Sequence, residues 1–158
     1  MVGLKIKQIE KNDIERVKNL VDRCRPYVAP HPDYNYWLLS QYSSEYTLLA
    51  EYKGKLVGFV SGFQIHGNPW EMFVIQICTD PDMRGAGIAN TLLEELYMRH
   101  NKNGEFAVEC TISPDNKASR NTFAGFAKNH GGSAEWMDIV FEGSIVERGF
   151  RVEIKRAF

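Results

Sequence analysis

The hydrophobic and polar positions of this chain follow two different periods, and their alternation predicts an α/β protein. Four segments carry apolar residues at every third or fourth position, as the buried face of a helix does. The segments between them are short and are either apolar throughout or alternating, which is typical of strands. The predicted order of elements is βααβββαβαββ. We expect helices at 12–25, 34–42, 88–97 and 116–130, and strands at 5–9, 47–51, 56–65, 72–79, 106–112, 136–141 and 150–154.

The way these segments are joined predicts a single domain that covers residues 1–158. No linker, internal repeat or low-complexity segment divides the chain. Gly54 lies in a short turn between two apolar runs, which predicts an antiparallel hairpin. The run 72–79 is almost entirely apolar, as a strand covered on both faces would be, and we expect it at the centre of the sheet. The last strand, 150–154, is expected to offer an exposed edge for a homodimer.

The composition narrows the classes of function. Nineteen basic and twenty acidic residues leave no basic excess for binding nucleic acid. No apolar run reaches the ~20 residues of a membrane span, and the first residues lack a signal-peptide core, so we expect a cytoplasmic protein with no membrane partner. Cys24, Cys78 and Cys110 lack C-x-x-C spacing, which favours reduced core residues over disulfides or a zinc site. No histidine has metal-ligand spacing, so we expect no metal.

The segment that follows the predicted central strand has the chemistry of an anion site. Arg84-Gly85-Ala86-Gly87 precedes a predicted helix, whose first N–H groups have no partner within the helix and carry a partial positive charge. Glycines allow a phosphate to approach these groups closely. A tight turn that needs small residues is the alternative interpretation. The dinucleotide-binding pattern and the P-loop are excluded, because the acidic residue of the former and the G-K-[ST] of the latter are missing.

These residues, with Ile88 and Ala89, resemble the acyl-CoA signature of the GNAT acetyltransferases, written [QR]-x-x-G-x-[GA]. The resemblance implies an α/β (α+β) fold with a mixed, mostly antiparallel central sheet of about seven strands, flanked by about four helices. It also implies acetyl-CoA as the cofactor, with its pyrophosphate held by the loop and its pantetheine arm held by backbone groups of the preceding strand. The cofactor-binding residues implied in this way are Ile77, Cys78, Thr79, Arg84, Gly85, Ala86, Gly87, Ile88, Ala89, Asn116, Ser119 and Phe123.

A longer block resembles one branch of that family, the diaminobutyrate acetyltransferases of ectoine synthesis. Residues 109–123 read ECTISPDNKASRNTF, which is similar to the pattern E-T-T-x-T-P-D-N-x-A-S-R-x-L-F of that branch. Two places depart from the pattern. Residues 29–33 lack the usual Leu-Asp-x-Asn-Ser-Ser run, and Ile75 stands where a tryptophan usually precedes the glutamine. The resemblance implies a small primary amine as the substrate, with 2,4-diaminobutyrate as the leading acceptor.

Glu109 is the leading candidate for the group that takes a proton from the acceptor amine. The strand 106–112 alternates, so Glu109 leaves the sheet on the side opposite to Val108 and Cys110. Deprotonating an ammonium group with a pKa near 10.4 costs about 4 kcal/mol at pH 7, and a carboxylate beside the pantetheine strand would lower that cost. The alternative is an ordinary glutamate that faces solvent or forms a salt bridge.

The acceptor pocket is expected around the second helix and the central strand. Gln76 is the one polar side chain in an apolar strand, so it needs a partner if it is buried. Phe123 stands where many family members have a tyrosine that protonates the leaving thiolate, so no acid is available there. Core packing is the alternative role for the tyrosines, and helix capping is the alternative for Asn116 and Ser119. The predicted substrate-binding residues are Asp33, Tyr34, Tyr36, Trp37, Gln76 and Glu109.

The first functional hypothesis is an acetyl-CoA-dependent N-acetyltransferase, in which a small primary amine attacks the thioester directly in a ternary complex. A relay through Cys78 or Cys110 is disfavoured because both lie in apolar strand patterns, which favour packing. Within the enzyme class, the alternative acceptors are a polyamine, an aminoglycoside or a protein N-terminus. The alternative outside that class is a non-catalytic acyl-CoA sensor with the same fold.

Overall fold

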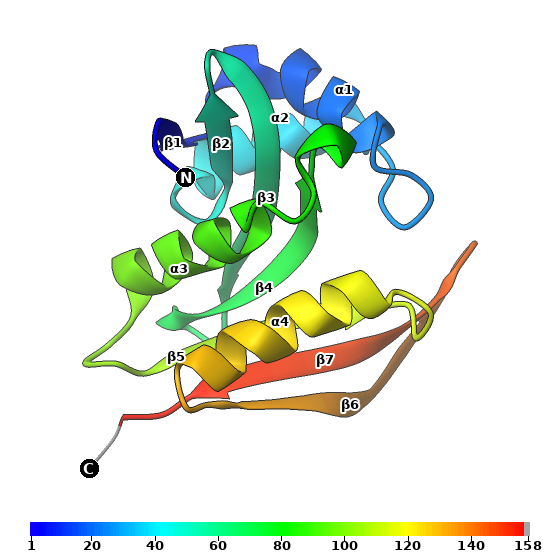
Figure 1. Cartoon of the computed structure of the whole chain (residues 1–158). Coiled ribbons are helices and arrows are strands. Elements are labelled where there is room, and N and C mark those ends of the chain that lie inside the picture. The colour runs from blue at the N-terminus through cyan, green and yellow to red at the C-terminus, as the bar shows by residue number, and fades with distance from the viewer. Residues whose placement is uncertain (157–158) are drawn as a thin grey trace.

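A sheet of seven strands forms the middle layer of the computed structural model, which describes residues 1–156 (Figure 1). The strands are β1 (Leu4–Gln8), β2 (Leu48–Tyr52), β3 (Lys55–Ile65), β4 (Asn68–Thr79), β5 (Phe106–Ile112), β6 (Ser133–Glu142) and β7 (Val146–Ile154). Their order across the sheet is β1-β2-β3-β4-β5-β7-β6. Neighbouring strands are antiparallel except β4 and β5, which run parallel. The predicted central position of β4 is therefore confirmed.

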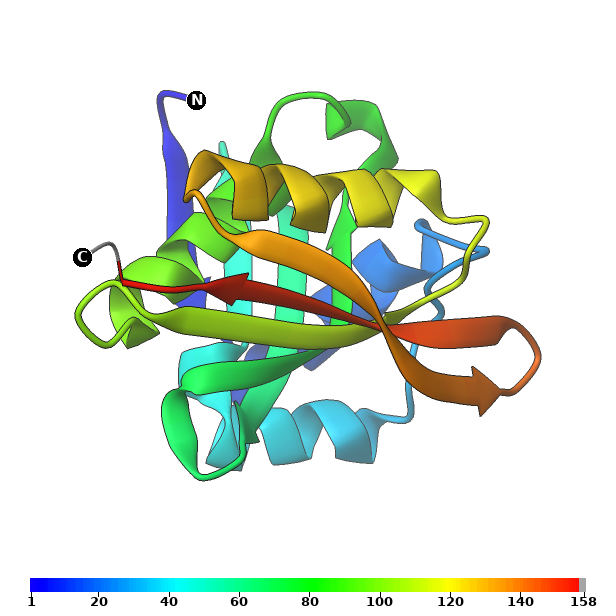
Figure 2. The ribbon, with the colours of Figure 1, turned by 90° about the horizontal axis from the view of Figure 1, so that it is seen from below.

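Four α-helices cover the two faces of this sheet. They are α1 (Ile14–Asp22), α2 (Asp33–Tyr42), α3 (Ile88–His100) and α4 (Lys117–Asn129). Residues of α3 and α4 belong to the core on one face, and residues of α1 and α2 belong to the core on the other. Figure 2 shows α2 and α4 on opposite sides of the sheet. None of the helices within residues 1–156 combines the length and the hydropathy that crossing a membrane requires.

Each face of the sheet has its own buried core. Leu92 of α3 and Phe126 of α4 are fully buried in the cluster that contains Val108 of β5. On the other face, Val17 of α1 is fully buried in the cluster that contains Phe59 of β3. These apolar stripes recur at helical spacing in the sequence, which is why the periodicity predicted the helices that contain them. The predicted order of elements and the predicted fold class are confirmed.

Strand β4 begins four residues earlier than predicted. His66 and Gly67 adopt φ angles of 56° and 71°, so they form a tight two-residue turn between β3 and β4. The sequence suggested a longer loop because Gly67 and Pro69 are both turn residues. Pro69 instead lies inside the strand, next to the hairpin turn.

Two further details of the prediction are wrong. The helix predicted at 12–25 is shorter, because α1 begins at Ile14 after a 3₁₀ turn, in which the carboxylate of Asp13 accepts a hydrogen bond from the N–H of Glu10 at 2.9 Å, and it ends at Asp22. The segment 150–154 is not an edge strand. It lies in β7, which pairs with β5 on one side and β6 on the other, so β6 forms the edge.

Gly58 of β3 leaves room for α3, and its replacement tests how closely that helix packs. A Cβ atom at Gly58 would overlap the side chain of Ile88 and lie 3.3 Å from Leu92 Cδ1. We expect Gly58→Ala to lower the free energy of unfolding by about 1–3 kcal/mol, the usual cost of overpacking. Urea denaturation measures the change.

Gly125→Ala is the matched control for this substitution. Position 125 lies in α4, where a Cβ would meet nothing within 4 Å. Alanine favours a helix over glycine, so this variant should raise the free energy of unfolding by about 0.5–1 kcal/mol. Equal effects of the two substitutions would contradict the close packing of α3 on β3.

Candidate active site

Strand β4 is paired with β5 along only part of its length. It pairs with β5 from Glu71 to Val74 only, whereas on its other side it pairs with β3 as far as Thr79. The register with β3 shifts at Ile75, which is an extra residue in β4 and forms a bulge. Beyond the bulge, β4 and β5 separate. In the part of the chain that the structure describes, one edge of residues 75–79 therefore has no strand beside it.

The free edge of β4 presents its backbone groups in alternation. The N–H of Asp80 donates to the carbonyl of Val57 at 2.8 Å. This bond shows which alternate residues of β4 bond to β3. In an antiparallel pair, every second residue bonds to the partner strand. The backbone groups of Ile77 and Thr79 therefore point away from β3 and into the opening, although the Thr79 carbonyl also accepts a bond from the Cys24 thiol at 3.3 Å. An extended ligand chain can pair with this edge as an added strand would.

A cleft of about 680 Å³ adjoins the free edge of β4. Its walls come from the end of β4, from the loop and first turn of α3, and from the start of α4. Ala86 and Phe123 do not line it. Ten of the predicted cofactor-binding residues do: Ile77, Cys78, Thr79, Arg84, Gly85, Gly87, Ile88, Ala89, Asn116 and Ser119.

The loop before α3 leaves backbone N–H groups free at the cleft. Gly85 and Gly87 have φ angles of 81° and 79°, which favour glycine, and a Cβ at either position would meet nothing within 4 Å. No side chain caps α3, and its first turn contains no acidic residue. Within residues 1–156, no acceptor bonds to the N–H groups of Gly87, Ile88 or Ala89. These residues therefore fit a diphosphate such as that of coenzyme A.

Asp80 fixes the point at which the chain leaves β4 for this loop. Its buried carboxylate accepts hydrogen bonds from the N–H of Asp82 at 2.9 Å and from Arg23 at 2.8 Å, and it lies 3.0 Å from Lys55 Nζ. Burial raises the pKa of Asp80, but these three partners outweigh burial and leave the pKa below its usual value. The ionised carboxylate therefore ties the loop to α1 and β3.

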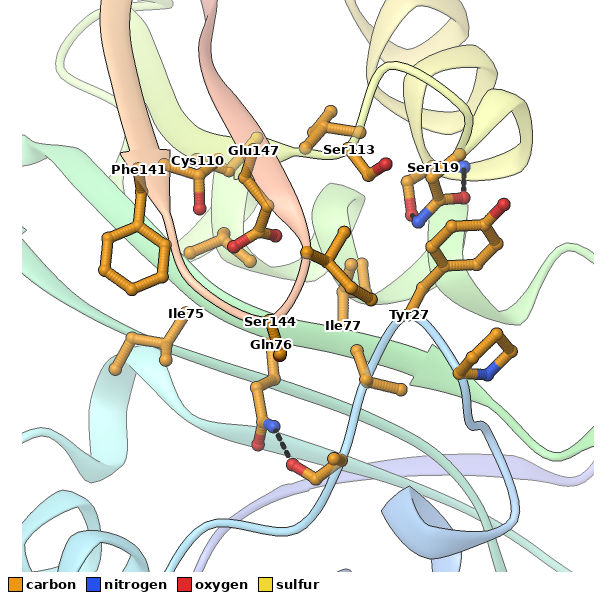
Figure 3. Close-up of a pocket in the computed structure, with 18 of the residues that line it drawn as sticks. Tyr27, Ile75, Gln76, Ile77, Cys110, Ser113, Ser119, Phe141, Ser144 and Glu147 are labelled. Atoms are coloured by element: carbon orange, nitrogen blue, oxygen red, sulfur yellow. Dashed lines mark hydrogen bonds between the residues drawn. The ribbon is translucent and has the colours of Figure 1, made fainter.

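A second cavity, of about 270 Å³, lies where β4 and β5 separate (Figure 3). We call it the splay cavity. Its walls come from residues 26–31, from β4 and β5 around the bulge, from the start of α4, and from the end of the β6–β7 hairpin. It adjoins the larger cleft, so a ligand chain that follows the edge of β4 would reach it. Five residues line both spaces: Tyr27, Val28, Ile77, Asn116 and Ser119.

Gln76 holds one wall of the splay cavity in place. Its side chain is buried, and Oε1 accepts a hydrogen bond from the Tyr36 hydroxyl at 2.9 Å, while Nε2 donates to the carbonyl of Ala29 at 2.8 Å. The Tyr36 hydroxyl also accepts from the N–H of His31 at 3.1 Å. Gln76 thereby ties residues 26–31 and α2 to β4. The prediction that this glutamine needs partners is confirmed.

Comparison with known proteins identifies the family. The profile of the Acetyltransferase (GNAT) family matches residues 14–126. The chain belongs to the GNAT acetyltransferase family. The predicted family and the predicted class of enzyme are therefore confirmed.

Two relatives of this GNAT protein share one name. The L-2,4-diaminobutyric acid acetyltransferase of Methylotuvimicrobium alcaliphilum is 36% identical over 113 residues, and that of Vibrio parahaemolyticus is 32% identical over 133 residues. The matches cover 72% and 80% of this chain, and 65% and 71% of the two relatives. The chain therefore spans about two thirds of the length of these relatives.

Solved structures agree with the fold. The diaminobutyrate acetyltransferase EctA of Paenibacillus lautus, in complex with its substrate L-2,4-diaminobutyric acid and coenzyme A, matches with a TM-score of 0.83 at 27% identity. That match covers 96% of this chain and 95% of EctA. Ard1 of Thermoplasma volcanium has a TM-score of 0.73 at 16% identity, over 98% of this chain and 100% of its own, and shows the fold alone. The coenzyme A of EctA agrees with the cofactor predicted for this GNAT protein.

Most of the predicted substrate-binding residues lie outside the splay cavity. Asp33 is exposed at the start of α2, Tyr34 is exposed and stacks on Trp37 at 5.8 Å, and Tyr36 is fully buried. Of the six predicted residues, Gln76 is the one that lines the cavity. The core-packing alternative therefore describes Tyr36. Acceptor binding by the remaining residues stays a prediction.

Glu109 lies on the predicted face of β5, but a basic side chain is paired with it. Its carboxylate accepts a hydrogen bond from Arg151 at 2.8 Å and lies 3.5 Å from His66 Nε2. Arg151 also lies 3.7 Å from Glu71. Glu109 lines neither the cleft nor the splay cavity. The salt-bridge alternative describes these contacts, and the catalytic role of Glu109 stays a prediction.

Three predicted residues at the start of α4 have structural roles beside the site. Asn116 caps the helix, since its Oδ1 accepts from the N–H of Ser119 at 3.2 Å and its Nδ2 donates to Ser119 Oγ at 3.1 Å. Both residues also line the two spaces, so capping does not remove them from the site. Phe123 is buried and lines the splay cavity, where it supplies no proton.

The cysteines are free and buried, as predicted. Burial raises the pKa of the Cys110 thiol far above its usual value. A hydrogen bond with Cys24 and burial together raise the pKa of Cys78. Because a thiol must ionise to act as a nucleophile, neither cysteine is suited to carry an acetyl group. Packing is the role that the structure supports for both.

The β6–β7 hairpin forms part of the site, which the sequence did not indicate. Phe141, Ser144, Ile145 and Glu147 line the splay cavity. Burial raises the pKa of Glu147, and a hydrogen bond with the Thr111 side chain partly opposes this effect. The predicted strands ended at residue 141 and began again at 150, so Ser144, Ile145 and Glu147 were assigned to a loop. No motif marks these three residues in the sequence.

Gly87→Ala tests whether the glycine loop binds the cofactor. A left-handed backbone costs a residue other than glycine about 1–2 kcal/mol, so alanine should shift the loop and its N–H groups. We expect the dissociation constant for coenzyme A to rise about tenfold, because 1.4 kcal/mol corresponds to a factor of ten. Isothermal titration calorimetry with coenzyme A measures the change.

Gly54→Ala is the matched control for the loop. Gly54 has a φ angle of 76°, and a Cβ there would meet nothing within 4 Å, but it lies in the turn between β2 and β3 and does not line the cleft. This variant should lose similar stability and bind coenzyme A as the wild type does. If Gly87→Ala also bound like the wild type, the loop would have no part in binding.

Proposed function

We propose that this GNAT protein transfers the acetyl group of acetyl-CoA to a primary amine of L-2,4-diaminobutyric acid. The observation that carries the proposal is the junction of two spaces at the free edge of β4, in a fold that matches the substrate complex of EctA with a TM-score of 0.83. The block 109–123, which resembles the diaminobutyrate branch, supports the same acceptor. The amine attacks the thioester directly, because neither buried cysteine in the strands is suited to act as a relay.

The binding roles follow from the free groups along the cleft. The N–H groups of residues 87–89 bind the diphosphate, and the backbone of Ile77 pairs with the pantetheine arm. Asn116 and Ser119 flank the passage from the cleft to the splay cavity. When bound, the cofactor supplies the acetyl group as a thioester. The protein holds the acceptor nitrogen next to the thioester. The two reactants then meet in the orientation that the attack requires.

Both departures from the diaminobutyrate pattern fall in the splay cavity. Ile75 lines it in place of the usual tryptophan, and residues 29–31, where the usual run is missing, form another part of its wall. This placement favours a second candidate function, the acetylation of a different small amine such as a polyamine, an aminoglycoside or a protein N-terminus. A non-catalytic acyl-CoA sensor would use the same cleft without turnover.

Two predictions about the wider context remain part of this proposal. A cytoplasmic location agrees with a small amino acid as the substrate. A homodimer would use the outer edge of β6, because β7 is paired on both sides. Gel filtration with light scattering measures the oligomeric state.

A panel of amines tests the proposed reaction. Acetyl-CoA is incubated with L-2,4-diaminobutyric acid, L-lysine, putrescine, an aminoglycoside and a short peptide, and a colorimetric thiol assay follows the release of coenzyme A. L-2-Aminobutyric acid is the matched control, because it lacks only the distal amine. We expect kcat/KM for L-2,4-diaminobutyric acid to exceed that for every other amine by at least about tenfold, or 1.4 kcal/mol.

The other outcomes of the panel separate the alternatives. Faster release with a polyamine, aminoglycoside or peptide would replace the acceptor and keep the class of reaction. Tight binding of coenzyme A without release for any amine would identify a sensor. Equal rates with L-2-aminobutyric acid and L-2,4-diaminobutyric acid would show that the distal amine has no role.

A further inference from the structure

We propose that Glu147 is the carboxylate that binds the acceptor's ammonium group in the splay cavity and takes the proton from the attacking nitrogen. This inference rests on the proposed function and names a residue that carries out one of its steps. It assigns to Glu147 the role that the sequence predicted for Glu109. The position, the charge environment and the contacts of the two glutamates favour this assignment.

Glu147 reaches the splay cavity from the start of β7. It pairs with Phe141 across the β6–β7 hairpin, and both residues line the cavity. In Figure 3 its carboxylate points from β7 into the space on the side of Ile75 and Gln76. A nitrogen held between Glu147 and β4 therefore lies beside the bulge, where a pantetheine arm paired with Ile77 would end.

The lining of the splay cavity favours a cation. Among the described residues that line it, Glu147 is the one acidic residue, and none is a lysine or arginine. From the loop 26–31, burial lowers the pKa of His31, which favours a neutral imidazole. Tyr27, from the same loop, and Cys110 of β5 are the other titratable groups in the lining, and the charge of Glu147 helps to keep the Cys110 thiol protonated. A negative charge in this half-buried position is stabilised by a cationic partner. The ammonium group of the acceptor would be that partner.

The carboxylate of Glu109, in contrast, already has a cationic partner within the protein. The guanidinium of Arg151 donates to its carboxylate at 2.8 Å, so an acceptor ammonium would compete with a charge held by the protein itself. Glu109 and Arg151 face each other across β5 and β7, and Glu147 lies four residues from Arg151 along β7. At 3.3 Å per residue, that separation is about 13 Å. The two glutamates therefore occupy different places on the sheet, and Glu147 is the one at the cavity.

The surroundings of Glu147 also suit a base. Burial raises the pKa of its carboxyl, and the nearby Thr111 hydroxyl opposes this effect without cancelling it. A carboxylate with a raised pKa takes up a proton more readily, which narrows the gap to the pKa of an alkylammonium group. Thr111 therefore acts as a positioning residue that tunes the proton affinity of Glu147.

The proposed step balances in protons and bonds. The ammonium group gives one proton to the carboxylate of Glu147, and the neutral nitrogen attacks the thioester carbon. A C–N bond forms and the C–S bond breaks, with its electron pair leaving on sulfur. A second proton passes from nitrogen to that sulfur through water, and Glu147 returns its proton to solvent. The products are the acetylated amine, the free thiol and one proton.

The test compares Glu147→Gln with Glu109→Gln, using L-2,4-diaminobutyric acid as the acceptor. Glutamine keeps the size of the side chain, so the fold should be retained, and thermal unfolding checks this. We expect Glu147→Gln to lower kcat/KM at pH 7 by about 10²–10⁴-fold, the usual contribution of a general base. Its affinity for coenzyme A, measured by calorimetry, should not change. Glu109→Gln should lower kcat/KM by less than about fivefold, which is under 1 kcal/mol.

The pH dependence separates a base from a residue with a structural role. In the wild type, kcat/KM should fall toward acidic pH as Glu147 becomes protonated. In Glu147→Gln only the amine that is already unprotonated in solution can react. Its kcat/KM should therefore rise about tenfold per pH unit, in place of the acidic limb of the wild type. Thr111→Val removes the hydroxyl that holds the pKa of Glu147 down, so the acidic limb of this variant should move to higher pH.

Two results would overturn the assignment. One is a Glu147→Gln variant that keeps the wild-type rate and pH profile; the other is a larger loss of activity in Glu109→Gln than in Glu147→Gln. Both differ from a failure of the proposed function, in which the wild type itself would not acetylate L-2,4-diaminobutyric acid. Titration of this amino acid into the coenzyme A complex adds a readout without turnover, and equal affinity in the wild type and Glu147→Gln would also contradict the binding role.

Discussion

The separation of β4 from β5 beyond Val74 is the constraint on which the rest of the site depends. A strand inside a sheet normally has both edges paired, and unpaired backbone groups are costly unless water or a ligand satisfies them. Here the edge at residues 75–79 is open while β3 still holds the other edge. The opening connects the cleft at α3 with the splay cavity, so a ligand chain that pairs with β4 delivers its end to the cavity.

Two buried polar groups keep this opening in shape. Gln76 uses both ends of its amide, one on Tyr36 and one on Ala29, and so fixes the near wall of the splay cavity to β4. Asp80 fixes the end of β4 through charged partners on α1 and β3. Because each group bonds to more than one other segment, the walls are set before any ligand arrives. Such preorganisation lowers the entropy that binding must overcome.

The parts of the fold that have a local sequence pattern could be predicted from the sequence. The wall of the splay cavity that the β6–β7 hairpin forms could not. The glycine loop was recognisable because positive φ angles require glycine at Gly85 and Gly87. Alternation gave the correct face for Glu109, but its partner Arg151 lies 42 residues later and comes near only when β5 pairs with β7. Around Glu147 the periodicity is weak, since the neighbouring Val146 is apolar but 51% exposed, and the end of the hairpin therefore resembled a loop.

The central claim is that the edge of β4 and the glycine loop together present a thioester to the splay cavity. A crystal structure of the protein with coenzyme A and L-2,4-diaminobutyric acid tests it most directly. We expect the diphosphate within hydrogen-bond distance of the N–H groups of residues 87–89, the pantetheine arm paired with Ile77, and an amine nitrogen closer to Glu147 than to Glu109. A diphosphate bound elsewhere, or an arm that leaves the edge of β4 unpaired, would contradict it.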